Sequence, residues 1–255
     1  MSEITEQQNM GWVSPPSDLT LSQDELHIWR ASLAPPPADL GALYEVLDRE
    51  ERLRAERYVF ARHRERFIVA RGVLRNILSL YLSLSPSEIL FEQNAYGKPS
   101  LKTGATAGTH LHFNVSHSED LALYAFAADA EVGVDVESIR PDFATERIAE
   151  RFFSPAEVRA LKELPAHLKA QAFFNCWTRK EAYIKALGKG LSHPLESFTV
   201  SLTPGLPAEL LCDETDLSEA GRWELRALQV DLGYAAALAV PKRNWQLRCY
   251  EWRAA

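Results

Sequence analysis

The sequence predicts a mixed α+β protein built from two α+β halves of similar size. Segments of alternating apolar residues, which are typical of strands, occur on both sides of residues 128–131. The segments run strand, helix, strands, then helices and strands again, and this order favours an α+β arrangement. We therefore expect a flexible N-terminal arm over residues 1–20, an N-terminal half over 21–129 and a C-terminal half over 130–255.

The N-terminal half is expected to begin with a short strand at "ELHIWRASL", followed by a proline-rich loop at "LAPPPADL". A long helical stretch comes next, from about Leu40 to Leu82, because apolar residues recur there at helical spacing. We expect this stretch to break near Arg62–Arg64. The half then closes with strands at "ILFEQN", "HFNVSH" and "LALYAFAAD".

The C-terminal half is expected to open with a strand at "EVGVDVE" and to continue with helices over about 143–163 and 166–187. Its remaining strands are expected near 197–202, 223–230, 234–240 and 246–251. Two helix starts share one signature, "SPSEI" at Ser85 and "SPAEV" at Ser154. In each, the serine is the N-cap, proline takes the first helical position and the glutamate closes a capping box.

The composition is that of an ordinary soluble globular chain and excludes several classes of function. Of the 255 residues, 46% are hydrophobic and 25% charged, and the net charge of −7 argues against non-specific binding to nucleic acid. No apolar run is long enough to cross a bilayer, and the first twenty residues lack a secretory signal. Three distant cysteines suit a reducing compartment. We expect a cytoplasmic protein without membrane or nucleic-acid partners.

Positive charge is concentrated between Arg49 and Arg75, where nine arginines (49, 52, 54, 57, 62, 64, 66, 71 and 75) accompany four glutamates (50, 51, 56 and 65). A solvated helix face with ion pairs between successive turns explains this pattern. A docking surface for an anionic small molecule explains it equally well. The segment alone does not decide between them.

The segment "EVGVDVE" places two carboxylates on one face of a strand. Three valines alternate with Gly133, Asp135 and Glu137, so one face is apolar and the other is acidic. On a solvated face the acidic pair is harmless, whereas in a cleft it needs a cation, and oxygen ligands on a rigid strand suit Mg²⁺. Gly133 leaves room for a close approach to the backbone.

The expected helix "QAFFNCWTRKEAYIKALGKGL" carries a third carboxylate. Glu181 shares its side of the helix with Trp177 and Ile184, which are expected in the core. A carboxylate there should be neutral, paired or metal-bound, because an unpaired buried charge is costly. One interpretation is an internal ion pair with Lys185, one turn further on. The other is that Glu181 faces a cleft with the strand's acids, and that Lys185 meets an anion there.

Two polar turns complete the candidates. Ser116 and His117 in "FNVSHSED" either cap the turn that ends their strand or donate hydrogen bonds to a phosphate. Lys98 in "AYGKPS" is held extended by the following proline and is either a solvated turn residue or a functional one. Neither turn is specific by itself.

Taken in order, "YGKP", "FNVSHS", "GVDVE" and "CWTRKEAYIKALGKGL" resemble the 4′-phosphopantetheinyl transferases of the larger, surfactin-synthetase-activating type. The last segment fits the family pattern W-x-x-K-E-A-x-x-K at every defined position, and the resemblance runs from about Arg49 to Phe198. It implies a pseudo-twofold monomer of two similar α+β halves. Each half would be a small, mostly antiparallel sheet packed with helices, and the active site would lie in the cleft between them.

The resemblance also implies a reaction. The 4′-phosphopantetheine arm of coenzyme A would be transferred to a serine hydroxyl of an apo acyl or peptidyl carrier protein, with release of 3′,5′-ADP. The carrier would belong to fatty acid, polyketide or nonribosomal peptide synthesis. The reaction would depend on Mg²⁺, or on Mn²⁺ in its place.

Catalytic roles follow from the same resemblance, residue by residue. Asp135 and Glu137 would hold the metal ion, and Glu181 would complete the acidic set. Glu181, or a water that it holds, is the candidate base for the carrier serine. Lys185 and His117 would bind oxygens of the pyrophosphate.

The nucleotide part of coenzyme A is assigned in the same way. Asn114, Ser116 and Lys98 would line its pocket. The family grips the 3′-phosphate with basic residues at the start of the helical region, but two glutamates interrupt them here. Arg54 is therefore our first choice for this contact and Arg62 our second.

Two other functions compete with this interpretation. A Mg²⁺-dependent hydrolase of nucleotide pyrophosphates would use the same acidic cleft, and it would release 3′,5′-ADP from coenzyme A without a carrier. A non-catalytic module that binds coenzyme A or a carrier domain would keep the basic contacts. Such a module has no need for Asp135, Glu137 and Glu181 together.

Overall fold

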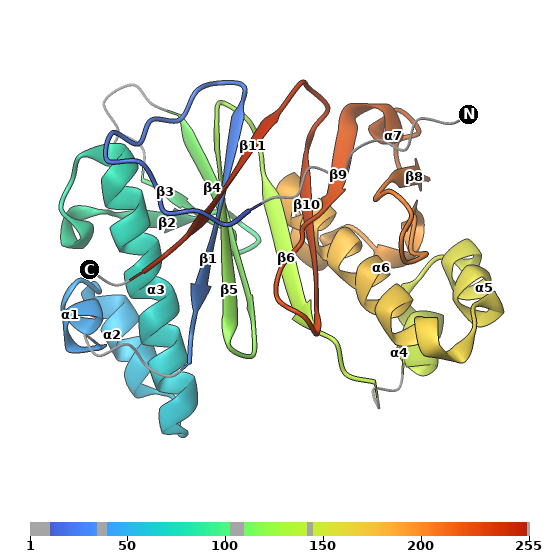
Figure 1. Ribbon diagram of the computed structural model, residues 1–255, viewed down its shortest axis with the longest axis horizontal. Helices are drawn as coiled ribbons and strands as arrows, with labels where there is room; N and C mark the ends of the chain where they lie inside the picture. Colours follow the sequence, from blue (N-terminus) through green and yellow to red (C-terminus); the bar gives the residue numbers. More distant parts are fainter. Residues whose placement is uncertain (1–10, 35–39, 103–109, 142–144, 254–255) are drawn as a thin grey trace.

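The computed structural model describes residues 11–34, 40–102, 110–141 and 145–253. Two sheets stand side by side in the middle of the molecule, and one long helix covers the outer face of each (Figure 1). This mixture confirms the predicted α+β class. In chain order the elements are β1 (Glu25–Ser32), α1 (Leu40–Glu45), α2 (Arg49–Glu56), α3 (Ala61–Leu82), η1 (Pro86–Glu88), β2 (Phe91–Gln93), β3 (Pro99–Leu101), β4 (Leu111–Ser118), β5 (Leu121–Ala128), β6 (Gly133–Ser138), α4 (Thr145–Phe152), α5 (Pro155–Glu163), α6 (Ala166–Leu187), η2 (Gly190–Ser192), η3 (Leu195–Ser197), β7 (Phe198–Val200), β8 (Leu210–Asp213), α7 (Glu219–Arg222), β9 (Trp223–Ala227), β10 (Tyr234–Pro241) and β11 (Gln246–Glu251).

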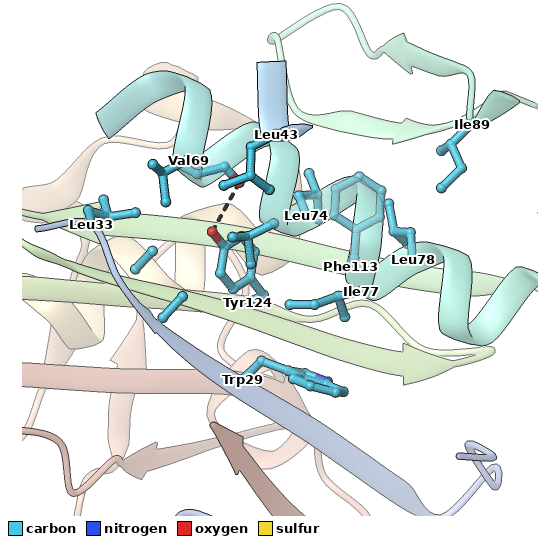
Figure 2. Packing of buried hydrophobic residues seen from close by; sticks show 14 of the residues in the cluster. Trp29, Leu33, Leu43, Val69, Leu74, Ile77, Leu78, Ile89, Phe113 and Tyr124 are labelled. Carbon is cyan, nitrogen blue, oxygen red and sulfur yellow. Dashed lines mark hydrogen bonds between the residues drawn. The ribbon is translucent and has the colours of Figure 1, made fainter. Parts of the chain in front are cut away.

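The first sheet has the strand order β11-β1-β5-β4 and is covered by α3. β1 pairs in parallel with β11, and the other two pairings are antiparallel. Trp29, Leu74 and Tyr124 are among the side chains buried between this sheet and α3 (Figure 2). The Tyr124 hydroxyl donates a hydrogen bond to the Ala70 carbonyl oxygen at 3.0 Å, so a buried polar group is satisfied while it joins the sheet to the helix.

The second sheet has the order β6-β10-β9, with both pairings antiparallel, and is covered by α6. Phe173 and Phe174 of α6 lie in the core on this side. α6 covers the range 166–187 that the sequence predicts, and it ends at Gly188. Gly188 has a φ of 66°, a left-handed conformation that glycine adopts without a steric penalty.

A third core lies between the two sheets. Val132, Val134 and Val136 are fully buried there, together with Ile28 of β1 and Leu123 of β5. Burying one such side chain contributes about 1.5–3 kcal/mol, so this core holds the halves together. The alternation in "EVGVDVE" therefore has a simple cause. The valines face the other sheet, and the acidic positions face α6.

The last strand crosses the boundary predicted at residues 129 and 130. β11 follows the C-terminal half in the sequence but lies beside β1 in the first sheet. Part of the predicted arm is bound here as well, because Val13 forms a bridge with Tyr250 and Trp12 Nε1 donates to the Gln229 carbonyl oxygen at 2.9 Å. Residues 1–10 and 35–39, which hold the rest of the arm and most of the proline-rich loop, lie outside the described ranges.

The helical stretch predicted from Leu40 to Leu82 is divided into three helices. The expected break near Arg62–Arg64 is wrong, because these residues form the first turn of α3 and the chain leaves helical conformation at 57–60 instead. α2 has its own capping box, in which Asp48 is the N-cap and Glu51 the reciprocal partner. Within the described residues, no helix is long and apolar enough to cross a membrane.

The two "S-P-x-E" signatures have different outcomes. At Ser154 the capping box is complete and starts α5. At Ser85 the box also forms, but only a three-residue 3₁₀ helix follows, because the chain turns into β2 after the buried Ile89. The fully buried Arg75 of α3 fixes that turn by donating to the carbonyl oxygens of Pro86 and Ile89, both at 2.9 Å.

Candidate active site

The site is built where β4 of the first sheet meets β6 of the second. Three side chains of β4, at every second position, accept hydrogen bonds from backbone N–H groups of β6. The pairs are Asn114 Oδ1 with Val134 N (2.9 Å), Ser116 Oγ with Val136 N (3.3 Å) and Ser118 Oγ with Ser138 N (3.0 Å). A ladder of side chains therefore joins the edge strands of the two sheets.

The same serines hold the acidic side chains of β6. Ser116 Oγ donates to Asp135 Oδ1 at 2.7 Å, and Ser118 Oγ donates to Glu137 Oε2 at 2.8 Å. Asp135 is only 3% exposed, and its Oδ2 is buried without a hydrogen-bond partner among the described residues. Buried carboxylate oxygens without a partner are rare because desolvation is costly, so this atom indicates a site for a cation or a donor.

Gly133 explains how the third acid reaches this place. A Cβ atom on Gly133 would lie 2.0 Å from the Ala182 carbonyl oxygen and 2.4 Å from the Ala186 nitrogen. The close approach that we expected at this glycine is therefore made by the backbone of α6. This close packing brings Glu181 and Lys185 of α6 toward the acidic positions of β6.

Lys185 makes its ion pair with Asp135 rather than with Glu181. Its Nζ lies 2.6 Å from Asp135 Oδ1, 3.1 Å from Ser116 Oγ and 3.3 Å from the Val134 carbonyl oxygen. The internal Glu181–Lys185 pair that the sequence allowed is therefore not the arrangement found. Lys185 is instead the cation that faces the acidic strand.

The carboxylates are close enough to shift one another's titration. Burial, followed by the charges of Asp135 and Glu137, raises the pKa of Glu181 to about 7, and the nearby Lys185 offsets only part of this. The pKa of Glu137 is also raised, first by burial and then by Asp135. Such mutual repulsion marks a group of acids that a divalent cation would stabilise.

The chemical type of the side chains at this site suits a hard divalent cation. Asp135, Glu137 and Glu181 offer carboxylate oxygens, which Mg²⁺ prefers, and the unpartnered Asp135 Oδ2 is one of them. Over the described ranges, no three His, Cys, Asp or Glu side chains already form a group that could hold a metal ion. Instead, the ammonium of Lys185 is paired with one oxygen of the Asp135 carboxylate, Oδ1.

A cleft of about 1100 Å³ lies between α2, the first half of α3 and the β2–β3 hairpin. Its wall combines cations with aromatic rings: the Arg54 guanidinium lies 5.2 Å from the centre of the Phe67 ring, and that of Arg71 lies 4.6 Å from the centre of the Phe91 ring. Arg57 lines it as well. Positive charge beside flat apolar surfaces suits an anionic ligand that carries a planar base.

The two arginines chosen from the sequence lie in different places. Arg54 lines the cleft. Arg62 does not, because it pairs with Asp120 at 3.3 Å, at the turn between β4 and β5, where Arg66 binds the same carboxylate. Glu51, which interrupts the basic residues in the sequence, binds the guanidinium groups of Arg71 and Arg75.

Lys98 supports the hairpin that forms one side of the cleft. Its Nζ lies 2.7 Å from Glu131 Oε2 and 3.3 Å from the Ala186 carbonyl oxygen. Asn94, the first residue after β2, donates to the Gly188 carbonyl oxygen at 2.8 Å. Both contacts fasten the hairpin to the C-terminal end of α6, where donors and cations satisfy free carbonyl groups.

His117 lies on β4, next to the acidic site. Its pKa is lowered, first by burial of the ring and then by the positive charges of Lys185, Arg66 and Arg54. Three cations therefore act on this imidazole. This positive potential borders the acidic site and suits a ligand with several negative charges.

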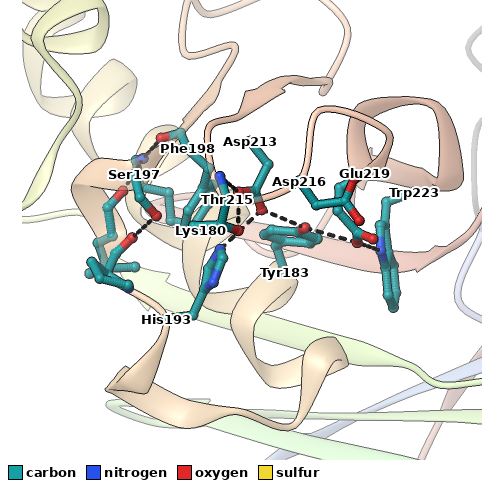
Figure 3. A network of polar contacts seen from close by, with 12 residues as sticks. Lys180, Tyr183, His193, Ser197, Phe198, Asp213, Thr215, Asp216, Glu219 and Trp223 are labelled. Carbon is teal, nitrogen blue, oxygen red and sulfur yellow. Dashed lines mark hydrogen bonds and ion pairs between the residues drawn. The ribbon is translucent and has the colours of Figure 1, made fainter.

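The opposite face of α6 is anchored by buried polar contacts (Figure 3). Lys180, fully buried, pairs with Glu157 at 2.8 Å and donates to the Leu195 carbonyl oxygen at 2.8 Å. Tyr183 donates to Asp213 at 2.9 Å, and His193 contacts the same carboxylate at 3.0 Å. These contacts fix the rotation of α6, and with it the side that carries Glu181.

Several of these residues escaped the sequence-based prediction. Ser118 lies two positions after Ser116 but just past the predicted strand "HFNVSH", and continuing the alternation by one residue would have placed it on the same face. Arg57, Arg71 and the aromatic wall of the cleft had no such signal, because their meeting depends on how α2, α3 and the hairpin pack.

Two family models match the chain, the 4′-phosphopantetheinyl transferase superfamily over residues 131–239 and the N-terminal part of 4′-phosphopantetheinyl transferases over residues 31–129. The 4′-phosphopantetheinyl transferase HetI of Nostoc sp. is 40% identical, over 94% of this chain and 98% of HetI. This chain belongs to the 4′-phosphopantetheinyl transferase superfamily. The predicted family is therefore confirmed, and the protein is a phosphopantetheinyl transferase.

Other relatives match smaller shares. The 4′-phosphopantetheinyl transferase psf-1 of Bacillus pumilus is 40% identical over 60% of this chain and 63% of its own. The human L-aminoadipate-semialdehyde dehydrogenase-phosphopantetheinyl transferase is 28% identical over 76% of this chain and 66% of its own. The crystal structure of Thermotoga maritima holo-[acyl-carrier-protein] synthase aligns with 44% of this chain and 63% of that one, at 24% identity and a TM-score of 0.36.

Proposed function

We propose that this phosphopantetheinyl transferase takes the 4′-phosphopantetheine arm from coenzyme A, in a Mg²⁺-dependent reaction, and transfers it to a serine hydroxyl of an apo acyl or peptidyl carrier protein. One observation carries this proposal. A buried, partly unpartnered Asp135 faces Lys185, in an acidic group that is bordered by the cations around His117. Acids and cations side by side suit a metal ion and a pyrophosphate together.

The metal ion would be held by Asp135, Glu137 and Glu181. When bound, Mg²⁺ supplies neutralisation of the negative charge that grows on the pyrophosphate as its bond breaks. Ser116 and Ser118 support this role, because they orient the Asp135 and Glu137 carboxylates, while Asp135 Oδ2 has no hydrogen-bond partner among the residues that the structure describes. Mn²⁺ would be accepted in its place, since it favours the same oxygen ligands.

Glu181 is our candidate for the base. In the reaction the serine oxygen forms a new bond to the phosphorus that carries the pantetheine arm, the bond from that phosphorus to the bridging oxygen breaks, and 3′,5′-ADP leaves. The serine proton passes to Glu181, directly or through a water. A pKa near 7 supports this role, because such a carboxylate is ionised in part at neutral pH and still accepts a proton.

The nucleotide part of coenzyme A would lie in the cleft beside α2. Arg54 remains our choice for the 3′-phosphate, now with Arg57 and Arg71 beside it, and Arg62 is less suited because it is paired with Asp120. Lys185 and His117 would bind pyrophosphate oxygens. Asn114, Ser116 and Lys98 would act indirectly, since their contacts hold β6 and the hairpin in place.

We also propose that one chain is a complete enzyme and works as a monomer in the cytoplasm. β4, β6, α6 and the cleft all belong to this chain. The partners would be coenzyme A and carrier proteins of fatty acid, polyketide or peptide synthesis, without nucleic acid or membrane. We propose that the two halves meet near residues 129 and 130. β11 is the exception, because it follows this boundary in the sequence but belongs to the first sheet.

The deciding experiment is a mass-shift assay. Purified protein, Mg²⁺ and coenzyme A are incubated with a panel of apo carrier proteins, and we expect each accepted carrier to gain the mass of one phosphopantetheine. Release of 3′,5′-ADP from coenzyme A without any carrier would point to a pyrophosphate hydrolase instead. Binding of coenzyme A that survives EDTA, without any product, would point to a binding module.

A further inference from the structure

The contacts of Lys185 leave its ammonium group no free proton. An ammonium has three donors, and Nζ of Lys185 has three oxygen neighbours within the protein: Asp135 Oδ1, Ser116 Oγ and the Val134 carbonyl oxygen. Any contact with a pyrophosphate oxygen therefore requires that Lys185 give up one of these partners. The ion pair with Asp135, at 2.6 Å, is the shortest of the three.

Asp135, by contrast, has one oxygen that is still available to a ligand. Its Oδ1 already serves Lys185 and Ser116, while its buried Oδ2 has no partner in the described part of the chain. A divalent cation on this carboxylate would lie within a few ångströms of the ammonium and would be repelled by it. The metal ion and Lys185 therefore compete for the same side chain.

Lys185 is able to move, unlike the other lysine of the motif. Its side chain is 27% exposed, whereas that of Lys180 is 1% exposed and is held by a buried glutamate and by carbonyl groups. The lysine stem has four rotatable carbons, so the ammonium can change partner while α6 keeps its position. His117 lies close enough for the charge of Lys185 to lower its pKa, on the side where the pyrophosphate is expected.

We propose that Lys185 is a built-in counter-ion of the acidic site, which leaves Asp135 for the pyrophosphate when coenzyme A binds. Coenzyme A thereby removes the competitor of the metal ion, and each of the two ligands strengthens the binding of the other. The inference rests on the proposed function of the site. It adds that the protein without coenzyme A binds a divalent cation weakly, because of one residue.

Binding of Mn²⁺, followed by electron paramagnetic resonance at one fixed pH, tests this proposal. The protein alone and its complex with coenzyme A are compared, without carrier protein, for the wild type and for Lys185→Met. We expect coenzyme A to tighten Mn²⁺ binding to the wild type by about ten- to a hundredfold, the usual range for coupled sites. Lys185→Met should bind Mn²⁺ about tenfold more tightly than the wild type when coenzyme A is absent, and its coupling should be smaller by a similar factor.

A matched control separates this contact from a general effect of charge. Lys169→Met removes one positive charge from the same helix, where Lys169 pairs with Glu146. We expect it to bind Mn²⁺ as the wild type does. Equal tightening in Lys169→Met and Lys185→Met would overturn the proposal, and so would no tightening in Lys185→Met. If Lys185→Met unfolds, which circular dichroism would show, Lys185→Gln takes its place with the same expectation.

The Lys185 ammonium can also be followed directly. In protein labelled with ¹⁵N at lysine Nζ, coenzyme A without metal should shift the Lys185 signal and leave the Lys180 signal in place. An unchanged Lys185 signal in the complex would overturn the proposal. The mass-shift assay keeps the two ideas apart: transfer to a carrier by a wild type that lacks the Mn²⁺ effect rejects this inference alone, whereas no transfer to any carrier rejects the proposed function.

Discussion

Lys180 and Lys185 lie five residues apart on α6, on faces of the helix that turn to different parts of the molecule. Lys180 is fully buried and bound to Glu157 and to backbone carbonyl groups, whereas Lys185 is partly exposed and bound to Asp135. The sequence pattern W-x-x-K-E-A-x-x-K contains both. One motif therefore holds two kinds of lysine: the first anchors the helix, and the second pairs with an acid of the candidate site.

The largest effect is expected on the anchored face. Lys180→Met leaves the Glu157 carboxylate buried without its cation, and removing one partner of a buried ion pair costs about 3–5 kcal/mol of folding free energy. Urea denaturation measures this loss. The matched variant Lys185→Met should lose less, since the Lys185 side chain is partly exposed and Asp135 keeps its hydrogen bond from Ser116. Equal losses in the two variants would contradict the division into two faces.

The next effect is expected on the reactive face. Glu181→Gln keeps the size of the side chain but removes both a carboxylate ligand and the candidate base, so transfer to the carrier should slow by about 10²–10³-fold. The initial rate of the mass shift measures this, and circular dichroism checks the fold. Glu163→Gln, an exposed position at the end of α5, should keep the wild-type rate. A near-normal rate in Glu181→Gln would mean that the metal and base assignments are wrong.

A smaller effect is expected beyond α6, in the cleft. Arg54→Ala should raise the KM for coenzyme A by about tenfold, because a hydrogen bond to a charged group contributes about 1.5–3 kcal/mol. The effect should be less with coenzyme A that lacks its 3′-phosphate. Arg62→Ala should leave this KM within about twofold, because Arg62 is exposed and paired with Asp120. A larger rise in this KM for Arg62→Ala than for Arg54→Ala would indicate that the 3′-phosphate binds at the β4–β5 turn instead.

The smallest effect concerns pH. The pKa of Glu181 is raised from 4.5 to about 7 in the folded protein, so between these values the folded state binds more protons than the unfolded state. The stability that this gives is present below pH 4.5 and is lost as the pH rises through 7. In EDTA, the difference in unfolding free energy between Glu181→Gln and the wild type should therefore grow in favour of the variant from pH 5 to pH 7. A difference that does not change with pH would contradict the burial of this carboxylate among other acids.

The strands and helices that carry the site were readable from the sequence because their patterns are local. Alternation placed Asp135 and Glu137 on one face of β6, and helical spacing put Glu181 and Lys185 one turn apart. What these faces meet was not readable. The sequence cannot show that α6 packs against Gly133, that Lys185 prefers Asp135 to Glu181, or that Arg62 pairs with Asp120. These partners are distant in the chain and depend on packing.

The same limit explains the outcome for Asn114 and Ser116. The family resemblance placed both in the nucleotide pocket, but in the structure they accept hydrogen bonds from backbone N–H groups of β6. Nothing in "FNVSHS" tells which strand will lie beside it. A polar residue at every second position of a strand indicates a polar face, and the partner of that face comes from the fold.

The place of β11 has a consequence for how the molecule is made. β1 pairs with β5 on one side and with β11 on the other, and Val13 hydrogen-bonds to the backbone of β11 at Cys249 and Glu251. During synthesis on the ribosome, β1 therefore keeps an unpaired edge until β11 has emerged. A chain that stops before β11 would therefore leave β1 as an open edge of the first sheet, although every residue of the candidate active site is present.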